Sequence, residues 1–414
     1  MSNTPTTYSL KIDLELRQRA QSAFPNGVYG HMNAASLSPA HPQFFARAEG
    51  GRLWDVDGNE YIDFMCSYGT NLLGHHHPKV DEAARRQQAI ADCTTGPSAL
   101  MLELAETFNN KVAHADWTMF AKNGTDATTI CVMTARAQTG RNTVVLATGA
   151  YHGANPWCTP AAKGVTEGEK ANQITYTYND VESLKQAVEQ AGDDLAAVIV
   201  SPFKHDVFED QEWPTDNFAK TARALCDQKG AALILDDVRC AFRFTTGSTW
   251  ETIGVLPDLC AMSKSVANGY SLSVVTGNDK FRTGAGEIYV TGSFWFASVS
   301  FAASLATIEA IETEGAIDKM HSAGSLLRQG LEELAGSYGF HLRQTGPVQM
   351  PLVLFEDDPM WEKNNFFCAE AARRGVYLHP WHNMFVCAAH EERDIREALE
   401  RIDGAFSALK KQFG

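Results

Sequence analysis

The sequence predicts an α/β fold in which helices cover a mostly parallel sheet. Three short apolar runs, at residues 143–147, 196–200 and 231–235, are predicted to be strands, with amphipathic helices near 180–191 and 215–229. Continuous apolar strands are typical of parallel sheets that are buried on both faces. With 414 residues, 44% of them hydrophobic, the chain can bury a large core and is long enough for a second, smaller domain.

The segment before these strands is predicted to contain helices and one hairpin. Residues 52–64 alternate apolar and polar positions around the pair Asp57-Gly58, which favours a hairpin with a tight turn. Helices are expected at 8–22, at 79–92, at 97–113 and from Asn123 onward.

The segment after the strands continues with mixed elements. A strand is predicted at 274–277, a helix at 300–314 and a strand at 350–355. The last helix repeats apolar residues at helical spacing, which indicates a packing face; these are Ile395, Leu399, Ile402 and Phe406.

Composition narrows the class of protein. The net charge of -15 argues against nucleic acid or an anionic membrane as a partner, because a negatively charged protein does not attract either of these negatively charged partners over long range. The nine cysteines are scattered and no secretory leader precedes them, so we expect reduced thiols in a cytoplasmic protein. No apolar run approaches the roughly 18 residues of a membrane span. The consecutive histidines His75-His76-His77 do not share a face, so no metal site is expected.

One lysine and one aspartate carry the strongest chemical signal. Lys264 stands among small residues, a short distance after an apolar strand that ends in Asp236. A Schiff-base enzyme needs this pair, because the lysine holds an aldehyde cofactor and the carboxylate contacts its ring nitrogen. Alternatively, Lys264 is a solvated surface lysine and Asp236 caps a strand. Ligands of parallel sheets gather at the carboxyl ends of strands, where Asp236 and Tyr151-His152-Gly153 are expected.

A helix start offers a second site. Asn123-Gly124-Thr125 opens a predicted helix, where backbone N–H groups and a hydroxyl can bind a phosphate. The alternative is an ordinary N-cap without a ligand.

Ordered blocks of the chain resemble a known family. From about Phe24 to the C-terminus the sequence is similar to the class III (omega) aminotransferases of fold-type I, and most similar to glutamate-1-semialdehyde aminomutase and its relatives. The blocks that carry this resemblance are 54–63, 74–78, 123–127, 151–153, 235–238, 257–264, 292–294 and 375–378.

The resemblance implies pyridoxal 5'-phosphate bound as a Schiff base to Lys264, with Asp236 at the pyridine nitrogen. It further implies a homodimer, and a large cofactor-binding domain at 61–320 with a seven-stranded type of sheet. A smaller α+β domain is implied from segments 1–60 and 321–414. The other residues that the resemblance assigns to the cofactor are Asn123, Gly124 and Thr125 at the phosphate, Tyr151, His152 and Val238 around the ring, and Ser293 from the neighbouring subunit.

The chain departs from the family at its substrate positions. Asn33 falls where the aminomutase has a carboxylate-binding arginine, and Ser201 replaces the glutamate of a Glu-Pro pair. The stretch 375–392 contains no arginine, although two-substrate members often use one there for the second carboxylate. Arg239 stands where glutamine is common; it is predicted either to bind an anionic substrate or to pair with Asp206 or Asp237. Tyr68 and His379 are further predicted substrate residues.

We therefore predict an enzyme that acts on a primary amine as an aminotransferase or an aminomutase. Because the second-substrate arginine is missing, an ammonia-lyase acting on a small anionic hydroxyamine, such as an amino acid or aminophosphonate, is the alternative. A non-catalytic homologue that binds the cofactor is a third hypothesis, and the presence of both Lys264 and Asp236 speaks against it.

Overall fold

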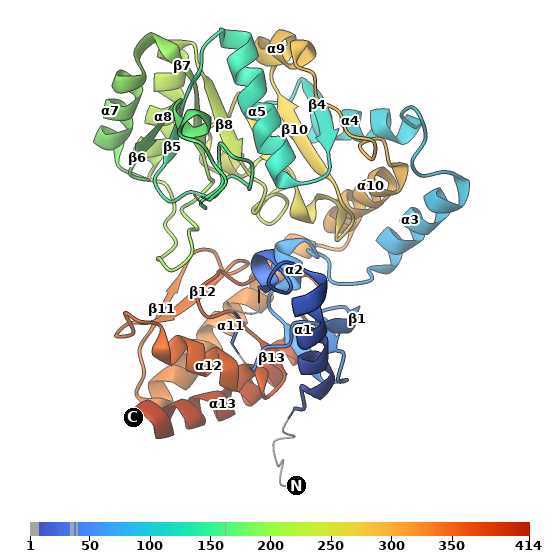
Figure 1. Cartoon of the computed structure of the whole chain (residues 1–414), viewed down its shortest axis with the longest axis vertical. Coiled ribbons are helices and arrows are strands. Elements are labelled where there is room, and N and C mark those ends of the chain that lie inside the picture. The colour runs from blue at the N-terminus through green and yellow to red at the C-terminus, as the bar shows by residue number, and fades with distance from the viewer. Residues whose placement is uncertain (1–7, 34–36, 39, 162) are drawn as a thin grey trace. The chain divides into compact units, whose positions relative to one another are not determined.

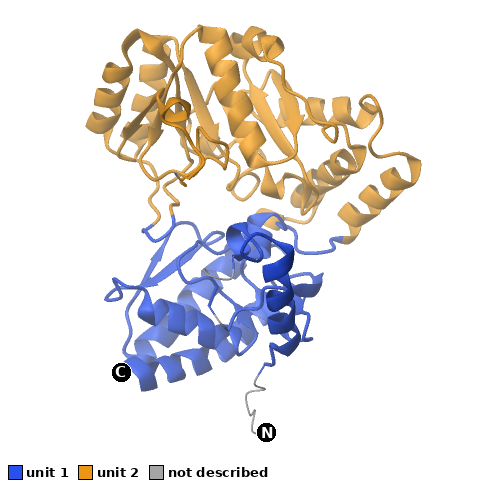
Figure 2. Cartoon of the chain, in the orientation of Figure 1, with its two compact units in different colours: residues 1–77, 207–210, 318–414 blue, residues 78–206, 211–317 orange. Residues whose placement is uncertain are grey.

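The computed structural model describes residues 8–33, 37–38, 40–161 and 163–414. These residues form two compact units, which Figure 2 shows in different colours. The larger unit consists of Pro78–Asp206 and Gln211–Ile317. The smaller unit combines the described parts of Met1–His77 with Val207–Asp210 and Asp318–Gly414. The domain boundaries at 60/61 and 320/321 stay a prediction.

The larger unit is built on a seven-stranded sheet with the order β4-β10-β9-β8-β7-β5-β6. All neighbouring strands are parallel except β10, which is antiparallel to both β4 and β9. The predicted mostly parallel sheet is therefore confirmed. Its strands are β4 (Trp117–Ala121), β5 (Thr143–Ala147), β6 (Gln173–Tyr176), β7 (Leu195–Val200), β8 (Ala232–Asp236), β9 (Leu259–Met262) and β10 (Ser273–Gly277).

Helices cover this sheet, and its five inner strands are buried along their whole length. All residues of β5, β7, β8, β9 and β10 are buried. Helix α5 crosses one face of the sheet, where its side chains join a core cluster with alternate residues of the strands (Figure 1). The helices and 3₁₀ turns of this unit are α3 (Pro78–Ile90), α4 (Ala99–Lys111), α5 (Gly124–Thr139), α6 (Glu167–Lys170), α7 (Val181–Ala191), η2 (Gly192–Asp194), α8 (Asp216–Lys229), η3 (Thr249–Ile253), η4 (Lys264–Ala267), η5 (Asp279–Phe281), α9 (Arg282–Glu287) and α10 (Ser298–Thr313).

The topology brings several loops to one edge of the sheet. Strands β5, β7, β8 and β9 run in the same direction, and β4 shares it because β10 reverses the direction twice. Their carboxyl ends therefore meet at a common edge. The segments that leave this edge contain Asn123, Tyr151-His152, Ser201, Asp236 and Lys264.

The smaller unit combines both ends of the chain in one α+β core. The predicted hairpin is present, since β2 and β3 pair antiparallel, and β13 from the C-terminal segment adds to β3 in parallel. Its strands are β1 (Phe45–Glu49), β2 (Arg52–Asp55), β3 (Glu60–Asp63) and β13 (Val376–Tyr377), with a separate pair β11 (Leu342–Thr345) and β12 (Leu352–Phe355). Its helices are α1 (Lys11–Ala23), η1 (Gly30–Met32), α2 (Cys66–Gly69), most of α11 (Ala316–Tyr338), α12 (Glu362–Ala372) and α13 (Glu392–Phe413).

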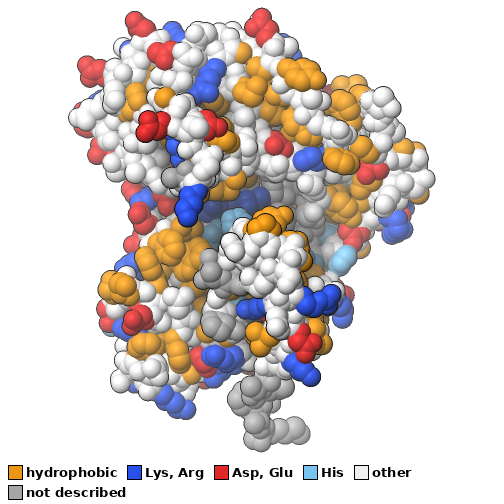
Figure 3. All heavy atoms as spheres, viewed as in Figure 1, with side chains coloured by type: hydrophobic (Ala, Val, Ile, Leu, Met, Phe, Trp, Pro, Cys, Tyr) orange, Lys and Arg blue, Asp and Glu red, His pale blue; other side chains and the backbone are white. Residues whose placement is uncertain are grey.

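The surface carries both acidic and basic side chains (Figure 3). Acidic and basic side chains are interspersed over the face drawn in Figure 3. Among the described residues, no helix combines the length and the apolar character needed to cross a membrane.

Candidate active site

Lys264 lies at the carboxyl edge of the sheet, two residues after β9 ends. It begins the turn η4 with a φ of 49°, a left-handed conformation that non-glycine residues rarely adopt. Burial, followed by the positive charges of Arg239 and Arg243, lowers the pKa of Lys264 to about 7, and the negative charge of Asp236 acts in the opposite direction. Much of the Lys264 amine is therefore neutral near pH 7, which is the form that attacks an aldehyde.

Asp236 ends β8, the strand next to β9, and its position pairs with Ala261 in the parallel register. Its Oδ2 lies 2.6 Å from His152 Nδ1, and its Oδ1 accepts a hydrogen bond from the Val238 N–H. Asp236 and His152 are 5% and 2% exposed, so their contact is shielded from water. Because a carboxylate only accepts, His152 donates its Nδ1–H, and this bond orients the carboxylate.

The loop that carries His152 is fastened to the N-terminus of α5. Thr128 Oγ1 donates to the His152 carbonyl at 2.7 Å, and the Ala154 N–H donates to Thr125 Oγ1 at 3.1 Å. His152 Nε2 is buried and has no hydrogen-bond partner among the described residues. The geometry thus brings the predicted residues His152, Asp236 and Thr125 into one connected arrangement.

The start of α5 has the geometry of an anion site. Asn123 is the N-cap and forms a capping box with Asp126, in which the Asn123 side chain accepts the Asp126 N–H. The N–H groups of Gly124 and Thr125 take no part in this capping box. A Cβ on Gly124 would lie 2.5 Å from Val238 Cγ1, so only glycine lets the Val238 side chain approach this turn. Gly124 and Val238, both predicted cofactor residues, are therefore in direct proximity.

Two arginines follow Asp236 on the same loop. Arg239 Nη1 donates to the His205 carbonyl at 2.9 Å, and Arg243 Nε donates to the Arg239 carbonyl at 3.1 Å. Burial lowers the pKa of Arg239, while the carboxylates of Asp236 and Asp206 act in the opposite direction. Arg243 was not among the predicted site residues, although it stands four residues after Arg239 with three apolar residues between them, which indicates that it is buried on the same loop.

The Asp237 carboxylate makes hydrogen bonds that stabilise the fold. It accepts hydrogen bonds from the N–H and the hydroxyl of Thr249, at 2.7 and 2.6 Å, and burial raises the pKa of its carboxyl to about 7. Both of its oxygens are used by Thr249, so Asp237 holds the η3 turn.

Three other predicted residues belong to this unit, and none of them takes part in the hydrogen bonds described above. Tyr151 is 38% exposed, and Ser293 is exposed on the loop between α9 and α10. Ser201 follows β7 directly and is buried, and its carbonyl accepts a hydrogen bond from the Tyr178 hydroxyl at 3.2 Å.

The remaining predicted substrate residues belong to the smaller unit. The Asn33 N–H closes the η1 turn on Gly30, and Tyr68 stacks on His31 with ring centres 4.6 Å apart. His379 Nδ1 accepts the His382 N–H at 3.1 Å, and burial, followed by His41 and His31, lowers the pKa of His379 to about 3. A neutral His379 does not serve as a cationic anchor for a carboxylate.

The larger unit fits pyridoxal phosphate by the chemistry of its donors. A phosphate suits the N–H groups at the start of α5, an electron-poor ring nitrogen suits the Asp236 carboxylate, and an aldehyde suits the neutral Lys264 amine. This donor set on a mostly parallel sheet defines the class of protein: an enzyme of fold-type I that uses pyridoxal phosphate.

Comparison with known proteins agrees with this class. Residues 34–406 match the family described as aminotransferase class-III, and the chain belongs to this family. An aminopentol aminotransferase from Sphingopyxis macrogoltabida is 46% identical over 399 residues, covering 96% of this chain and 94% of the relative. A glutamate-1-semialdehyde 2,1-aminomutase from Desulforamulus reducens is 30% identical, over 96% of this chain and 98% of the relative.

A solved structure extends the likeness to three dimensions. The pyridoxal phosphate internal aldimine form of the FumI protein from Sphingopyxis sp. MTA144 has a TM-score of 0.96 and 46% identity, and the match covers 97% of each chain. The predicted fold class, the cofactor and the enzyme class of aminotransferase or aminomutase type are confirmed. The relatives give no support to the lyase alternative. The roles of individual residues stay predictions.

Proposed function

We propose that this chain is an aminotransferase that takes the amino group from a hydroxylated aliphatic amine without a carboxylate and passes it to a small 2-oxo acid. The observation that carries the cofactor chemistry of this proposal is the Asp236–His152 contact of 2.6 Å at the carboxyl edge where Lys264 also lies. The name of the aminopentol aminotransferase relative supports the amine class, because a pentol is a hydroxylated carbon chain.

The residues at this edge have separate tasks in the proposed reaction. Bound pyridoxal phosphate withdraws electrons from the substrate carbon that carries the nitrogen, which makes its C–H bond acidic. Lys264 removes that proton, since its neutral amine is a base of suitable strength near pH 7. Asp236 keeps a proton on the pyridine nitrogen, and His152 holds the carboxylate in place. The first turn of α5 binds the phosphate through its N–H groups.

The donor pocket is proposed to lack the arginine with which the family binds the carboxylate of its amine substrate. Asn33 occupies the position of the family's substrate arginine, and an amide cannot form the bidentate ion pair that an arginine forms. His379 is neutral, as described above, and cannot replace it. We therefore expect amines without a carboxylate to react faster than amino acids, and glutamate-1-semialdehyde to be a poor substrate.

The acceptor is proposed to carry one carboxylate, held by Arg239. The stretch 375–392 offers no arginine for a second one. We expect kcat/KM to be at least about tenfold lower with 2-oxoglutarate than with pyruvate, because an unpaired carboxylate costs about 1.4 kcal/mol or more. The measurement is keto-product formation by the purified holoenzyme from an aminopentol or a similar amino polyol, with each acceptor in turn.

Three outcomes of this assay contradict parts of the proposal. Equal rates with both acceptors would reject the single-carboxylate acceptor. Faster turnover of amino acids than of the amino polyol would reject the donor class. Ammonia release without any acceptor would reject amino transfer and favour the lyase.

Cofactor uptake is expected to depend on pH through Lys264. Because the pKa of Lys264 is lowered to about 7, its neutral fraction rises with pH and levels off above this value. The rate of uptake by the cofactor-free protein should increase about tenfold between about pH 6 and pH 8, whereas an unperturbed lysine gives about a hundredfold increase without a plateau. Stopped-flow absorbance measures both, with N-acetyl-lysine amide as the unperturbed control. If the rate of uptake by the protein rises steadily up to pH 9, as the rate of the control does, the pKa of Lys264 is not lowered.

We also propose a homodimer in which Ser293 reaches the partner's phosphate site. The support is a set of exposed apolar side chains on the larger unit, which also carries Ser293: Ile90 is 80%, Leu102 64%, Tyr289 87% and Phe294 69% exposed. Exposed apolar side chains that gather in one patch mark protein contacts, and the segments that carry Ile90 and Phe294 meet where the Cys93 thiol donates to the Ser293 carbonyl at 3.2 Å. A cytoplasmic location is proposed as well, and its support is that no disulfide joins the nine cysteines, all of which lie in the described part.

A further inference from the structure

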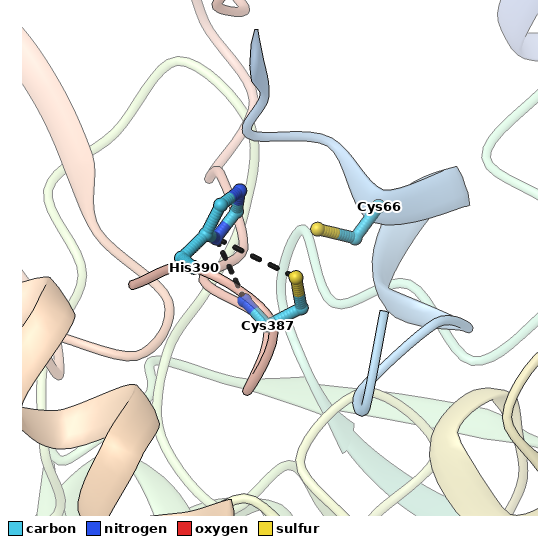
Figure 4. A group of neighbouring side chains, drawn as sticks. All are labelled: Cys66, Cys387 and His390. Atoms are coloured by element: carbon cyan, nitrogen blue, oxygen red, sulfur yellow. Dashed lines mark hydrogen bonds between the residues drawn. The ribbon is translucent and has the colours of Figure 1, made fainter. Parts of the chain in front are cut away.

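Three buried side chains with metal-binding chemistry meet in the smaller unit, outside the site described above. Cys66, Cys387 and His390 are 2%, 0% and 3% exposed, and their ligand atoms all lie within 4.8 Å of one another. Figure 4 shows the Cys66 and Cys387 thiols pointing toward each other, with the His390 ring beside Cys387. Among the described residues this is the one such group found.

The backbone holds the two segments of this Cys66-Cys387-His390 cluster together. The Phe385 N–H donates to the Phe64 carbonyl at 2.8 Å, and the Ala388 N–H donates to the Leu72 carbonyl at 2.7 Å. The Cys66 N–H donates to Asp63 Oδ1 at 3.0 Å. The positions of both thiols are thus determined by hydrogen bonds on either side of them.

The position of the His390 ring is also determined by its neighbours. It stacks on Phe64, with ring centres 4.9 Å apart and an angle of 28°. A Cβ on Gly51 would lie 2.4 Å from His390 Cδ2, so the absence of a side chain there makes room for the ring. The backbone at Cys66, Ser67 and Tyr68 has positive φ values of 45°, 53° and 56°. Such conformations cost energy in non-glycine residues and persist only where the surroundings impose them.

We propose that this cluster is a binding site for Zn²⁺, with Cys66 Sγ, Cys387 Sγ and His390 Nδ1 as ligands. Two sulfurs and one imidazole nitrogen are the donors that zinc prefers. Zn–S and Zn–N bonds of about 2.3 and 2.0 Å at a tetrahedral angle place the two donor atoms about 3.5 Å apart. The Cys387 Sγ to His390 Nδ1 distance is 3.5 Å.

Charge balance also suits a buried zinc ion. Binding releases the two thiol protons, and two thiolates with one neutral imidazole neutralise the double positive charge of the metal. No net charge is then buried, which avoids the main cost of an ion in a protein interior. The Nδ1 lone pair, which accepts the Cys387 N–H at 3.1 Å in the metal-free arrangement, passes to the metal.

The fourth position of a tetrahedral site would be taken by a water molecule or by a backbone carbonyl close to Cys66. The carbonyl oxygens of Asp63 and Phe385 lie 3.3 and 3.5 Å from Cys66 Sγ, where they accept its thiol hydrogen in the absence of metal. Ligand atoms of a tetrahedral zinc site are separated by about this distance. Because all the ligands belong to one unit, the ion would join the turn at Cys66 to the 387–390 segment and stabilise that unit.

Zinc binding to the full-length holoenzyme tests the proposal. The protein is purified without a metal-affinity step, stripped with a chelator, kept saturated with pyridoxal phosphate, and titrated with Zn²⁺ alone. Metal bound after gel filtration is measured by mass spectrometry. We expect about one zinc ion per chain for the wild type. Cys66→Ala and Cys387→Ala should bind zinc at least about a hundredfold more weakly, since even a lost outer partner costs about 10–100-fold.

The matched control is Cys368→Ala, which removes another buried cysteine of the smaller unit, 3% exposed, in α12. It should bind zinc as the wild type does. Cobalt substitution of the wild type needs no variant: thiolate ligation of Co²⁺ should give red-region absorption bands beyond those of the cofactor. Less than about a tenth of a zinc ion per chain, equal binding by all the variants, or a Cys66–Cys387 disulfide in the protein as purified would overturn the proposal. These readouts are independent of amino transfer.

Discussion

Replacement of Lys264 by alanine is expected to abolish amino transfer. The amine has two tasks in the proposed reaction, as the covalent anchor of the cofactor and as the base that moves the proton. Loss of the base alone costs up to about 10⁴-fold, so kcat should fall by at least about that factor. The Lys264→Ala protein should also lose the visible absorption band of the Schiff base. Steady-state kinetics and an absorption spectrum measure the two effects.

Lys280→Ala serves as the control for this change. Lys280 lies in the turn η5 of the same unit, where its amine is 5.2 Å from the centre of the Phe281 ring. Its removal should leave kcat and the spectrum unchanged. A Lys264→Ala protein that keeps the visible band and a tenth or more of the wild-type rate would refute the assignment of Lys264 as the cofactor lysine.

Asp236→Asn is expected to lower kcat by roughly 100- to 1,000-fold while the protein stays folded, a loss comparable to removal of one electrostatic stabiliser from an active site. The amide has nearly the same shape but no negative charge, so it cannot keep a proton on the pyridine nitrogen. It also weakens the 2.6 Å contact with His152, which loses its charged acceptor. Kinetics and thermal unfolding are measured on the same sample.

The neighbouring Asp237→Asn change is the matched control, because it removes an adjacent buried carboxylate of the same loop. Asp237 is bound to Thr249 through both oxygens, so its loss should lower Tm and leave kcat within a few fold. The opposite pattern, with Asp237→Asn inactive and Asp236→Asn active, would show that the two roles had been exchanged.

Strands β5, β7 and β8 could be predicted because nearly all of their residues are apolar. The runs at β5, β7 and β8 are too short for helices and are bounded by polar residues, so their type was clear. Strands β4, β6 and β9 were not predicted. Gln173–Tyr176 mixes polar and apolar residues, and Leu259–Met262 has only four residues, so neither shows a period of its own. Their strand conformation depends on pairing with neighbours, which a local pattern does not contain.

The site residues that could be predicted from the sequence are those that stand at the end of a predicted strand or shortly after one. Asp236 and Lys264 lie at or just beyond strand ends, and parallel strands bring such positions together. The effect of Arg243 on Lys264 could not be predicted this way, because it depends on the burial of both side chains. The loss of basicity of His379 likewise follows from packing in the smaller unit.

The sequence by itself determined the fold class, the family and the cofactor, because ordered blocks and continuous apolar strands are properties of neighbouring residues. Only the tertiary structure decided the lowered pKa of Lys264 and the contact between Asp236 and His152. It also decided the Cys66-Cys387-His390 cluster, whose members appear scattered in the sequence. Distances between remote side chains depend on strand pairing and loop packing, and spacing along the chain does not encode them.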